Sequence, residues 1–176
     1  MSELRKANTD HPYFVTMTIV GWIDIFTRKE YCNIITKSLE FCRKNKGLKI
    51  YEYAIMPSHV HLILQSLDCK LFSIVRDFKS FTAKEIIKTI EKSGFESRKE
   101  WLLHMFQYHA MFKKQNINYM LWQKTNYPVE LNTSYIFEQK REYIRNNPIE
   151  SGLVTDSGSW YYSSACPISP LKMDNS

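Results

Sequence analysis

The chain has 176 residues, of which 44% are hydrophobic and 14% aromatic. This composition excludes an intrinsically disordered chain and is sufficient for one domain with a hydrophobic core. The 24 lysines and arginines outnumber the 18 acidic residues, and the resulting net charge of +6 is compatible with a polyanionic partner without requiring one.

The cysteines and the N-terminus indicate the compartment. The four cysteines form no CxxC pair, and their spacing suits neither a zinc ribbon nor a disulfide framework: Cys32, Cys42, Cys69 and Cys166. The N-terminus has no apolar signal-peptide core, and the apolar stretch over 13–26 is too short to cross a bilayer. We therefore expect a reduced, cytoplasmic protein that has no membrane partner.

The first half of the chain predicts three strands and one helix. β-Branched and aromatic residues over 13–20 predict a strand. A helical apolar period follows, with Thr27 as the expected N-cap and an end near Gly47. Residues 48–56 and 59–65 predict two further strands, joined by a very short turn at Pro57 and Ser58.

The second half predicts more helix. Apolar stripes predict helices over 71 to about 91 and over 101–114. Residues 118–132 predict a hairpin around Thr125 and Asn126. Thr133 or Ser134 is expected to cap a last helix that runs through Asn146 and ends at Pro148. The tail is extended and aromatic, and residues from about 167 to 176 are expected to fray.

This order of elements predicts an α+β fold. Its first five elements, β-α-β-β-α, match the start of the ferredoxin-like pattern. We therefore expect one antiparallel β-sheet with helices packed on one face, formed by a single domain over residues 1–176. The sequence shows no internal repeat and no domain boundary.

The sequence His59-Val60-His61 is the most informative pattern. Side chains in a strand alternate between faces, so both imidazoles project to one side while Val60 faces a core. Two imidazoles one step apart can bind one metal ion. The last helix carries Tyr143 and Asn147 at i and i+4, which places them on one helical face.

If that helix covers the histidines, one pocket holds two imidazoles, an amide oxygen and a phenol. Two nitrogens and one neutral oxygen leave positions on Mg²⁺ or Mn²⁺ for phosphate oxygens and water. Metal polarisation of a phosphodiester would make attack by the phenol feasible.

Two segments of the chain resemble the HUH single-tyrosine transposases. Residues 56–63, Met-Pro-Ser-His-Val-His-Leu-Ile, resemble the HUH motif, and residues 143–154, which begin Tyr-Ile-Arg-Asn-Asn-Pro, resemble the tyrosine helix of the REP-associated branch. Segments 78–83, 121–124 and 160–165 are also similar to that branch. The resemblance covers residues 11 to 166. The chain departs from the pattern at Ser58, where an asparagine often precedes the first histidine.

The resemblance implies a metal-dependent endonuclease and strand transferase that acts on single-stranded DNA next to a hairpin. Tyr143 would form a 5′-phosphotyrosine, and His59, His61 and Asn147 would hold Mg²⁺ or Mn²⁺. No small-molecule cofactor is implied, and a nucleoid location is expected. The family includes homodimers whose tyrosine helix serves the partner's histidines and monomers with all parts in cis, and the sequence does not choose between them.

Several residues have competing interpretations. Tyr127 is an alternative nucleophile, and Gln139 is an alternative third ligand one turn before Tyr143. Basic residues on the 71–91 helix could contact DNA phosphates or form an ordinary solvated face, and two aromatic residues could stack bases or pack at an edge strand. These candidate DNA contacts are Arg76, Lys79, Lys84, Lys88, Trp122 and Tyr119.

Two other functions remain open. A domesticated, non-catalytic protein could bind hairpin DNA without cutting it, and binding would then survive Tyr143→Phe with no covalent adduct from the intact protein. A metal-dependent hydrolase unrelated to DNA would lose activity in EDTA but keep it in Tyr143→Phe.

Overall fold

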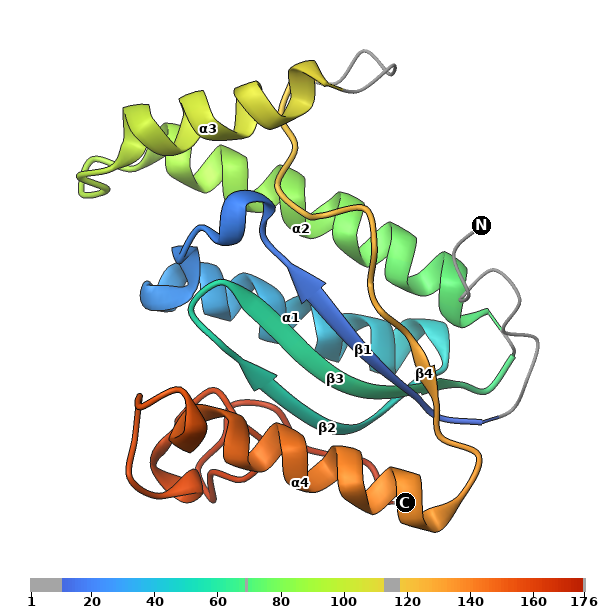
Figure 1. The fold of residues 1–176 in the computed structure, drawn as a ribbon. Helices are drawn as coiled ribbons and strands as arrows, with labels where there is room; N and C mark the ends of the chain where they lie inside the picture. The colour runs from blue at the N-terminus through green and yellow to red at the C-terminus, as the bar shows by residue number, and fades with distance from the viewer. Residues whose placement is uncertain (1–10, 69, 113–117, 176) are drawn as a thin grey trace.

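The structure is a computed structural model that describes residues 11–68, 70–112 and 118–175. Four strands form one sheet in the order β2-β3-β1-β4, and every neighbouring pair is antiparallel (Figure 1). The strands are β1 (Tyr13–Thr18), β2 (Leu48–Ile55), β3 (His59–Ser66) and β4 (Val129–Glu130). This order and the two crossover helices confirm the ferredoxin-like antiparallel sheet.

Three helices lie on the first face of the sheet or beyond it. α1 (Lys29–Lys46) and α2 (Leu71–Lys92) pack on this face, and α3 (Lys99–Met111) packs against α2. α1 ends at Gly47, whose φ of 63° is a left-handed conformation that glycine adopts without a Cβ penalty. The larger core lies here, and its sheet residues include Val15, Met17, Leu62 and Leu64.

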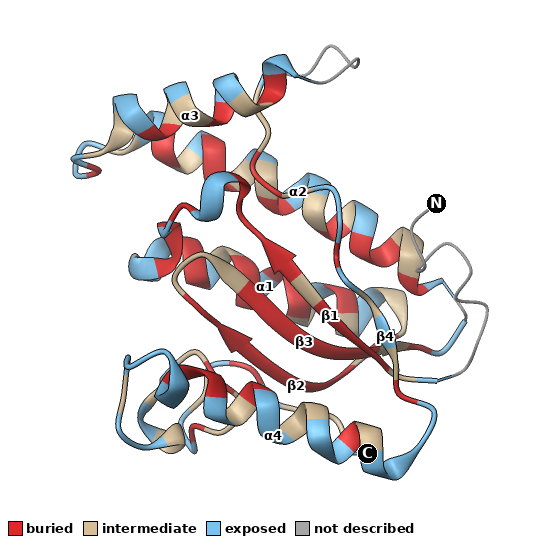
Figure 2. Cartoon of the chain, in the orientation of Figure 1, coloured by how far each residue is buried: buried red, intermediate tan, exposed pale blue. Residues whose placement is uncertain are grey.

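The fourth helix, α4 (Ser134–Glu150), covers the opposite face of the sheet (Figures 1 and 2). A second, smaller core joins Phe14 and Ile63 of the sheet to Phe137 and Ile144 of the helix. The expectation of helices on one face therefore describes α1 and α2 only. β1 and β3 are largely buried on both faces, since Val15 and Leu62 belong to the larger core and Phe14 and Ile63 to the smaller one.

β2 contains a bulge beside α4. Its pairing with β3 shifts between Ile50 and Glu52, so Tyr51 is the extra residue. Tyr51 belongs to the smaller core, and the buried Glu52 also meets α4. A bulge lets two consecutive side chains serve one face, which alternation alone would forbid.

The segment before α4 differs from the predicted hairpin. It runs alongside β1 as a single edge segment: the Gln123 N–H donates to the Thr18 carbonyl at 2.8 Å, and the Thr16 N–H donates to the Asn126 carbonyl at 2.8 Å. Only Val129 and Glu130 form a regular strand. The segment is already paired to β1, so it needs no second strand of its own.

Helix ends also differ from the predictions. Thr27 does not cap α1, since Arg28 is its N-cap and makes no side-chain cap bond. Thr133 caps α4 by accepting from the Ile136 N–H. Pro148 lies inside α4 and does not end it, because a proline so near the C-terminus removes only one backbone hydrogen bond. The Ser151 N–H still bonds the Asn147 carbonyl at 3.0 Å.

The tail through residue 175 packs onto β2, whereas it was expected to fray. Leu171 is buried in the larger core, and the Asp174 N–H donates to the Ile50 carbonyl at 2.8 Å. The Asp174 carboxylate accepts from the Ile50 N–H in return. β2 is the outer strand of the sheet, so these bonds satisfy backbone groups that would otherwise face solvent.

The cysteines and the helix lengths bear on the expected compartment. Cys32, Cys42 and Cys166 are free thiols, and Cys69 lies outside the described residues, as do residues 113 and 114 of the expected third helix. Within the described ranges, no helix has the length and apolar character needed to cross a membrane.

Candidate active site

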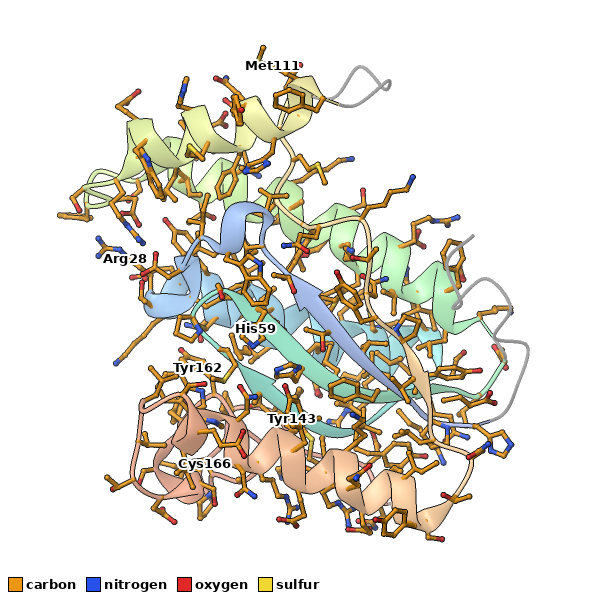
Figure 3. The ribbon with its side chains drawn as sticks, viewed as in Figure 1. Arg28, His59, Met111, Tyr143, Tyr162 and Cys166 are labelled. Carbon is orange, nitrogen blue, oxygen red and sulfur yellow. The ribbon has the colours of Figure 1, made fainter. Side chains whose placement is uncertain are left out.

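The histidines lie on the sheet face that α4 covers. His59 and His61 pair across β3 and β1 with Thr18 and Thr16, and all four side chains share this face. In Figure 3 the Tyr143 side chain extends from α4 toward the strand that bears His59. The structure thus brings together the predicted strand and the predicted helix of one chain.

His61 is buried and has one unsatisfied nitrogen. Its Nδ1 lies 2.9 Å from the Thr16 hydroxyl, whereas its Nε2 is buried with no hydrogen-bond partner among the described residues. Burial, followed by the nearby His59 and Lys140, lowers the pKa of His61 to about 3. The imidazole is therefore neutral at physiological pH, which is the form that binds a metal.

His59 lies directly beside His61. Their ring centroids are 4.6 Å apart, and His59 Nδ1 is 3.2 Å from the Ser58 hydroxyl. Burial lowers the pKa of His59 below its usual value. Ser58, which departs from the asparagine of the resembled motif, therefore still offers a hydrogen-bonding group to the first histidine.

Tyr143 reaches His61 from α4, and Asn147 lies one helical turn further along the same helix. The Tyr143 ring lies 5.2 Å from the His61 ring and is 39% exposed, so a substrate can reach it. Asn147 is 8% exposed, and its Oδ1 is buried without a hydrogen-bond partner in the described part of the chain. Sites that leave a buried acceptor unpaired are rare in folded proteins and call for an explanation.

These donors suit a hard divalent cation. His61 Nε2 and Asn147 Oδ1 are both buried, and neither has a hydrogen-bond partner among the described residues. Among the described residues, no three His, Cys, Asp or Glu side chains cluster as a metal site, so the third donor here would be an amide. A set of two nitrogens and one neutral oxygen has little charge of its own, which leaves room for the phosphate of a substrate.

Lys140 and Phe14 complete the surroundings of Tyr143. The Lys140 ammonium lies 4.9 Å from the Phe14 ring centroid and 5.5 Å from that of Tyr143. Phe14 also packs against His61, with centroids 5.6 Å apart. The sequence interpretation did not include Lys140, although its position three residues before Tyr143 places it on the same side of the helix.

Ion pairs attach α4 to the sheet on both sides of Tyr143. The buried Glu52 carboxylate lies 3.2 Å from Arg141 and accepts from Arg145 at 2.7 Å. The Ser164 hydroxyl donates to the same carboxylate. Because Arg141 and Arg145 flank Tyr143 on α4, this cluster fixes the segment that carries the phenol.

The segment after α4 strengthens this attachment. The Ser164 N–H donates to the Tyr53 carbonyl at 2.9 Å, and the Trp160 indole N–H donates to the Ile55 carbonyl at 2.9 Å. These bonds run along the free edge of β2. Both the helix and its C-terminal extension are therefore tied to the sheet that bears the histidines.

The structure gives two of the predicted DNA contacts, Lys79 and Trp122, partners within the protein. Trp122 is only 5% exposed, packs against Phe26 and donates its indole N–H to Thr82, so its ring is not available to a base. Lys79 is half-buried and donates to the Gln123 carbonyl and to Asn126 Oδ1. It secures the edge segment, and burial lowers its pKa to about 8.

The other predicted DNA contacts lie on α2, which covers the face away from the histidines. Arg76 pairs with Asp77 at 2.8 Å, Lys84 is exposed, and Lys88 lies 3.8 Å from Glu85. Their contact with phosphates stays a prediction. Tyr119 is partly buried against the larger core.

The competing nucleophile and ligand do not share the environment of Tyr143. Tyr127 is 61% exposed on the edge segment, where its φ of 43° is left-handed. Gln139 is exposed on α4. Among the described residues, Tyr143 has a ring contact with His61, whereas no such contact is found for Tyr127 or Gln139.

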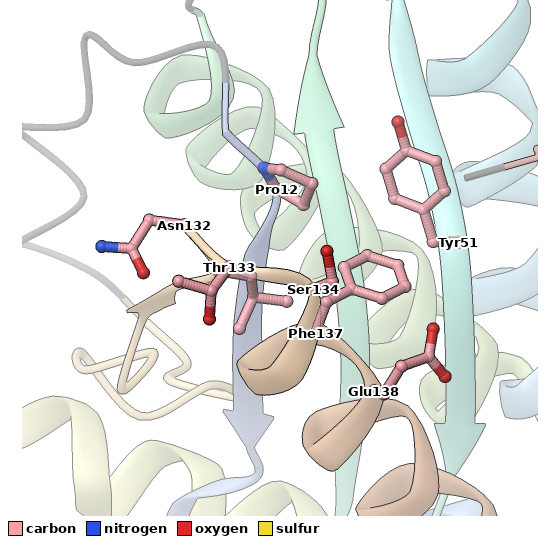
Figure 4. Close-up of a pocket in the computed structure, with 8 residues that line it drawn as sticks. Pro12, Tyr51, Asn132, Thr133, Ser134, Phe137 and Glu138 are labelled. Carbon is pink, nitrogen blue, oxygen red and sulfur yellow. The ribbon is translucent and has the colours of Figure 1, made fainter.

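A separate shallow pocket lies at the start of α4 (Figure 4). Its volume is about 380 Å³, and its lining includes Pro12, Tyr51 and Phe137. None of His59, His61, Tyr143 or Asn147 lines it. The candidate active site is therefore not this pocket but the contact between β3 and the C-terminal half of α4.

Comparison with known proteins finds similarity to transposases. A family model described as "Transposase IS200 like" matches residues 23–107, a range that contains both histidines and ends before α4. The structure of a REP-associated tyrosine transposase bound to a REP hairpin is similar over 95% of this chain and 87% of that chain, with 17% identity and a TM-score of 0.62. This likeness concerns the fold.

A protein of Deinococcus radiodurans R1 assigned as a transposase matches 77% of this chain and 88% of its own, with 17% identity and a TM-score of 0.49. No curated protein matches the chain. Over residues 23–107, which include the histidine motif, the chain is similar to the IS200-like transposases, and its fold is similar to that of a REP-associated tyrosine transposase.

Proposed function

We propose that this protein is a transposase that cleaves and rejoins single-stranded DNA next to a hairpin, with Tyr143 as the nucleophile. His59, His61 and Asn147 would hold Mg²⁺ or Mn²⁺. The observation that carries the proposal is the pair of buried, unpartnered acceptors, His61 Nε2 and Asn147 Oδ1, on two elements that meet beside Tyr143. A bound divalent ion would satisfy both acceptors at once and withdraw charge from a phosphate.

Tyr143 supplies the attacking oxygen. A bond forms between Tyr143 Oη and the phosphorus, and the bond from phosphorus to the 3′-oxygen of the preceding nucleotide breaks. The 3′-oxygen keeps the electron pair and takes up a proton, while the phenol loses its proton to solvent. The products are a 5′-phosphotyrosine and a free 3′-hydroxyl, and the reverse step rejoins DNA without ATP.

The surroundings of Tyr143 support a role as nucleophile and not only as a packing residue. The ring is partly exposed although it contacts His61 and Phe14. The Lys140 ammonium near the ring adds positive charge where a phosphodiester would bind. The Glu52 cluster holds the helix, so the phenol needs little reorganisation before attack.

Hairpin DNA is proposed as the partner on two grounds. A protein of the same fold is known bound to a REP hairpin. The net charge of +6 suits a polyanion. Since α4 covers the histidines of its own chain, we further propose that all parts of the site act in cis within one subunit.

The experiment uses hairpin DNA whose flanking single strands have randomised sequence, so that an unknown recognition site does not hide activity. The protein is incubated with this pool and Mn²⁺, and the products are run on a denaturing gel. A protein–DNA adduct is expected for the wild type and for Tyr127→Phe. It is expected to be absent from Tyr143→Phe and in EDTA.

Other outcomes favour the other functions. Hairpin binding with no adduct from the wild type would support a non-catalytic binding protein. An activity that EDTA abolishes but Tyr143→Phe retains would support a metal-dependent hydrolase.

A further inference from the structure

Four aromatic rings contact one another in succession, in the order Trp22, His59, His61 and Tyr143. We call them the row of rings, and Trp22 and Tyr143 are its two ends. Trp22 follows β1 in a short 3₁₀ turn, Val20–Trp22, and its ring centroid is 5.5 Å from that of His59. His59 is 4.6 Å from His61, and His61 is 5.2 Å from Tyr143. The indole is 62% exposed, so one side of it is open beside the metal-ligand candidates.

The backbone of Trp22 is strained. Gly21 and Trp22 have consecutive left-handed φ values of 63° and 55°. For a residue with a Cβ this conformation costs about 1–2 kcal/mol, and an indole that is mostly exposed recovers little of it by burial. Asparagine or glycine would form the same turn at lower cost. The fold alone therefore does not account for a tryptophan here.

The turn is held rigidly. The Trp22 N–H donates to the Ile19 carbonyl at 3.1 Å, and the Val20 N–H donates to the Leu121 carbonyl at 2.9 Å. Gly21 is pressed against α3, since a Cβ there would come within 3.0 Å of His109 Nε2. A rigid turn that presents an exposed aromatic ring is suited to recognition, because little conformational entropy is lost on binding.

We propose that Trp22 stacks on one base of the single-stranded substrate. Aromatic side chains stack on unpaired bases of any sequence, and a strained, exposed position is typical of a functional site. The proposal rests on the function proposed above, which places the scissile phosphate at the histidines. It transfers to Trp22 the stacking role that the sequence had suggested for the buried Trp122.

The row of rings also selects which base is bound. In an in-line displacement the leaving oxygen lies opposite the nucleophile. Tyr143 is at one end of the row and Trp22 at the other. The nucleotide that leaves with its 3′-hydroxyl is therefore the one on the Trp22 side. Its base, directly 5′ to the cut, is the base that stacks.

The first test measures binding without cleavage. Labelled oligothymidylate is titrated in EDTA and followed by fluorescence anisotropy. Trp22→Asn is expected to weaken binding by roughly five- to a hundredfold, the range typical of one stacked base. Trp22→Phe keeps a ring and should stay close to the wild type. Trp101→Ala, at an exposed tryptophan on α3, is the matched control and should not change affinity.

Thermal melting separates a lost contact from a lost fold. Trp22→Asn should melt no lower than the wild type because it relieves backbone strain. Unchanged DNA affinity in Trp22→Asn overturns the proposal. The result does not depend on cleavage, so it is distinct from failure of the adduct experiment.

A second measurement uses the wild-type protein. Oligothymidylate that carries 5-iodouracil is cross-linked by light, and the cross-linked tryptic peptides are sequenced by mass spectrometry. Attachment at Trp22, in the peptide of residues 7–28, supports the proposal. Cross-links confined to other peptides contradict it.

A third experiment tests which base stacks on Trp22. The DNA recovered from the adduct experiment identifies the cleaved sequence, and abasic nucleotides are then placed on either side of the cut. An abasic nucleotide directly 5′ to the cut should slow the wild type and leave Trp22→Asn unaffected. An abasic nucleotide directly 3′ to the cut should slow both proteins equally. The reverse pattern would overturn the assignment of the base.

Discussion

At the scale of single residues, Asn147 carries the clearest sign of a function beyond folding. Its side-chain oxygen is buried and has no hydrogen-bond partner in residues 11–68, 70–112 and 118–175, and an unpaired buried acceptor costs a folded protein about 1–3 kcal/mol. A leucine of similar shape would fill the same space without that cost. The amide is therefore explained by a ligand that binds to its oxygen and not by the stability of the chain.

Replacement of Asn147 by leucine should separate stability from metal binding. In EDTA, Asn147→Leu is expected to melt at a higher temperature than the wild type, because the unpaired amide is gone. Addition of Mn²⁺ should raise the melting temperature of the wild type but not of the variant. The neighbouring exposed Asn146, changed to alanine, serves as the control and should respond to Mn²⁺ like the wild type. A Mn²⁺ response retained by Asn147→Leu would remove Asn147 from the ligand set.

At the scale of elements, the attachment of α4 to β2 determines where the phenol lies. Glu52 is buried, and its two arginine partners are 23% and 39% exposed. A buried carboxylate between two cations is strongly coupled to both, whereas an exposed pair contributes little. Glu138 offers the comparison, because it pairs with the same Arg141 at 2.9 Å but is 56% exposed.

Glu52→Gln should loosen α4 selectively. We expect a loss of about 1–3 kcal/mol in the free energy of unfolding, measured by denaturant titration, since charged hydrogen bonds are lost. Amide hydrogen exchange should accelerate in α4 more than in α1. Glu138→Gln should change stability by less than about 0.5 kcal/mol. Equal effects of the two substitutions would contradict a special role for the buried cluster.

A second ion-pair cluster joins α1 to the start of α3 and gives a pH-dependent prediction. Burial alone would raise the pKa of Glu96, but hydrogen bonds from the Arg98 N–H, Arg28 and Tyr31 outweigh it and lower the pKa. A carboxylate with a lowered pKa in the folded state stabilises the protein above its unfolded pKa of about 4.3. That stability is lost as the pH falls through the folded pKa.

Glu96→Gln is therefore expected to be less stable than the wild type at pH 7, by about 1–3 kcal/mol. The difference between the two proteins should shrink as the pH falls below the unfolded pKa of about 4.3 toward the lower pKa of folded Glu96. Denaturant titrations over a pH series measure it. A difference that stays constant down to pH 3 would show that the Glu96 charge does not matter.

Local sequence patterns predicted most of the helices and strands, but they did not predict the tertiary contacts around individual residues. The period of two at His59 and His61 is local, and the structure brings His59 and His61 side by side and Tyr143 against His61. The shared face of Tyr143 and Asn147 follows from their helical spacing. The burial of Trp122 depends on Phe26 and Thr82, which are distant in the sequence. The helical position of Pro148 and the single edge segment likewise depend on tertiary contacts. Neither the strain at Trp22 nor the β-bulge at Tyr51 has a local sequence signature.

At the scale of the whole molecule, the arrangement of α4 bears on how many subunits make one site. The helix packs on β2 and β3 of its own chain, and the segment after it pairs with β2. A helix exchanged between subunits would have to break the Glu52 cluster and the β2 edge bonds. The fold therefore favours a complete site in each subunit.

Mixing two inactive variants tests this arrangement. Tyr143→Phe keeps intact histidines, and His61→Ala keeps the nucleophile. If each site forms in cis, a mixture of the two should give no adduct beyond that of either alone. If helices are exchanged, the mixture should recover activity at hybrid sites. The wild type diluted with each variant controls for inhibition.

We propose that Tyr143 attacks DNA at a metal site formed by His59, His61 and Asn147. The most direct measurement digests the protein–DNA adduct formed with Mn²⁺ and sequences the modified peptide. Trypsin separates Tyr143, in residues 142–145, from Tyr127, in residues 125–140. We predict that the nucleotide is attached to Tyr143 and that His61→Ala forms no adduct. Attachment to Tyr127, or an adduct that persists in His61→Ala, would contradict the account.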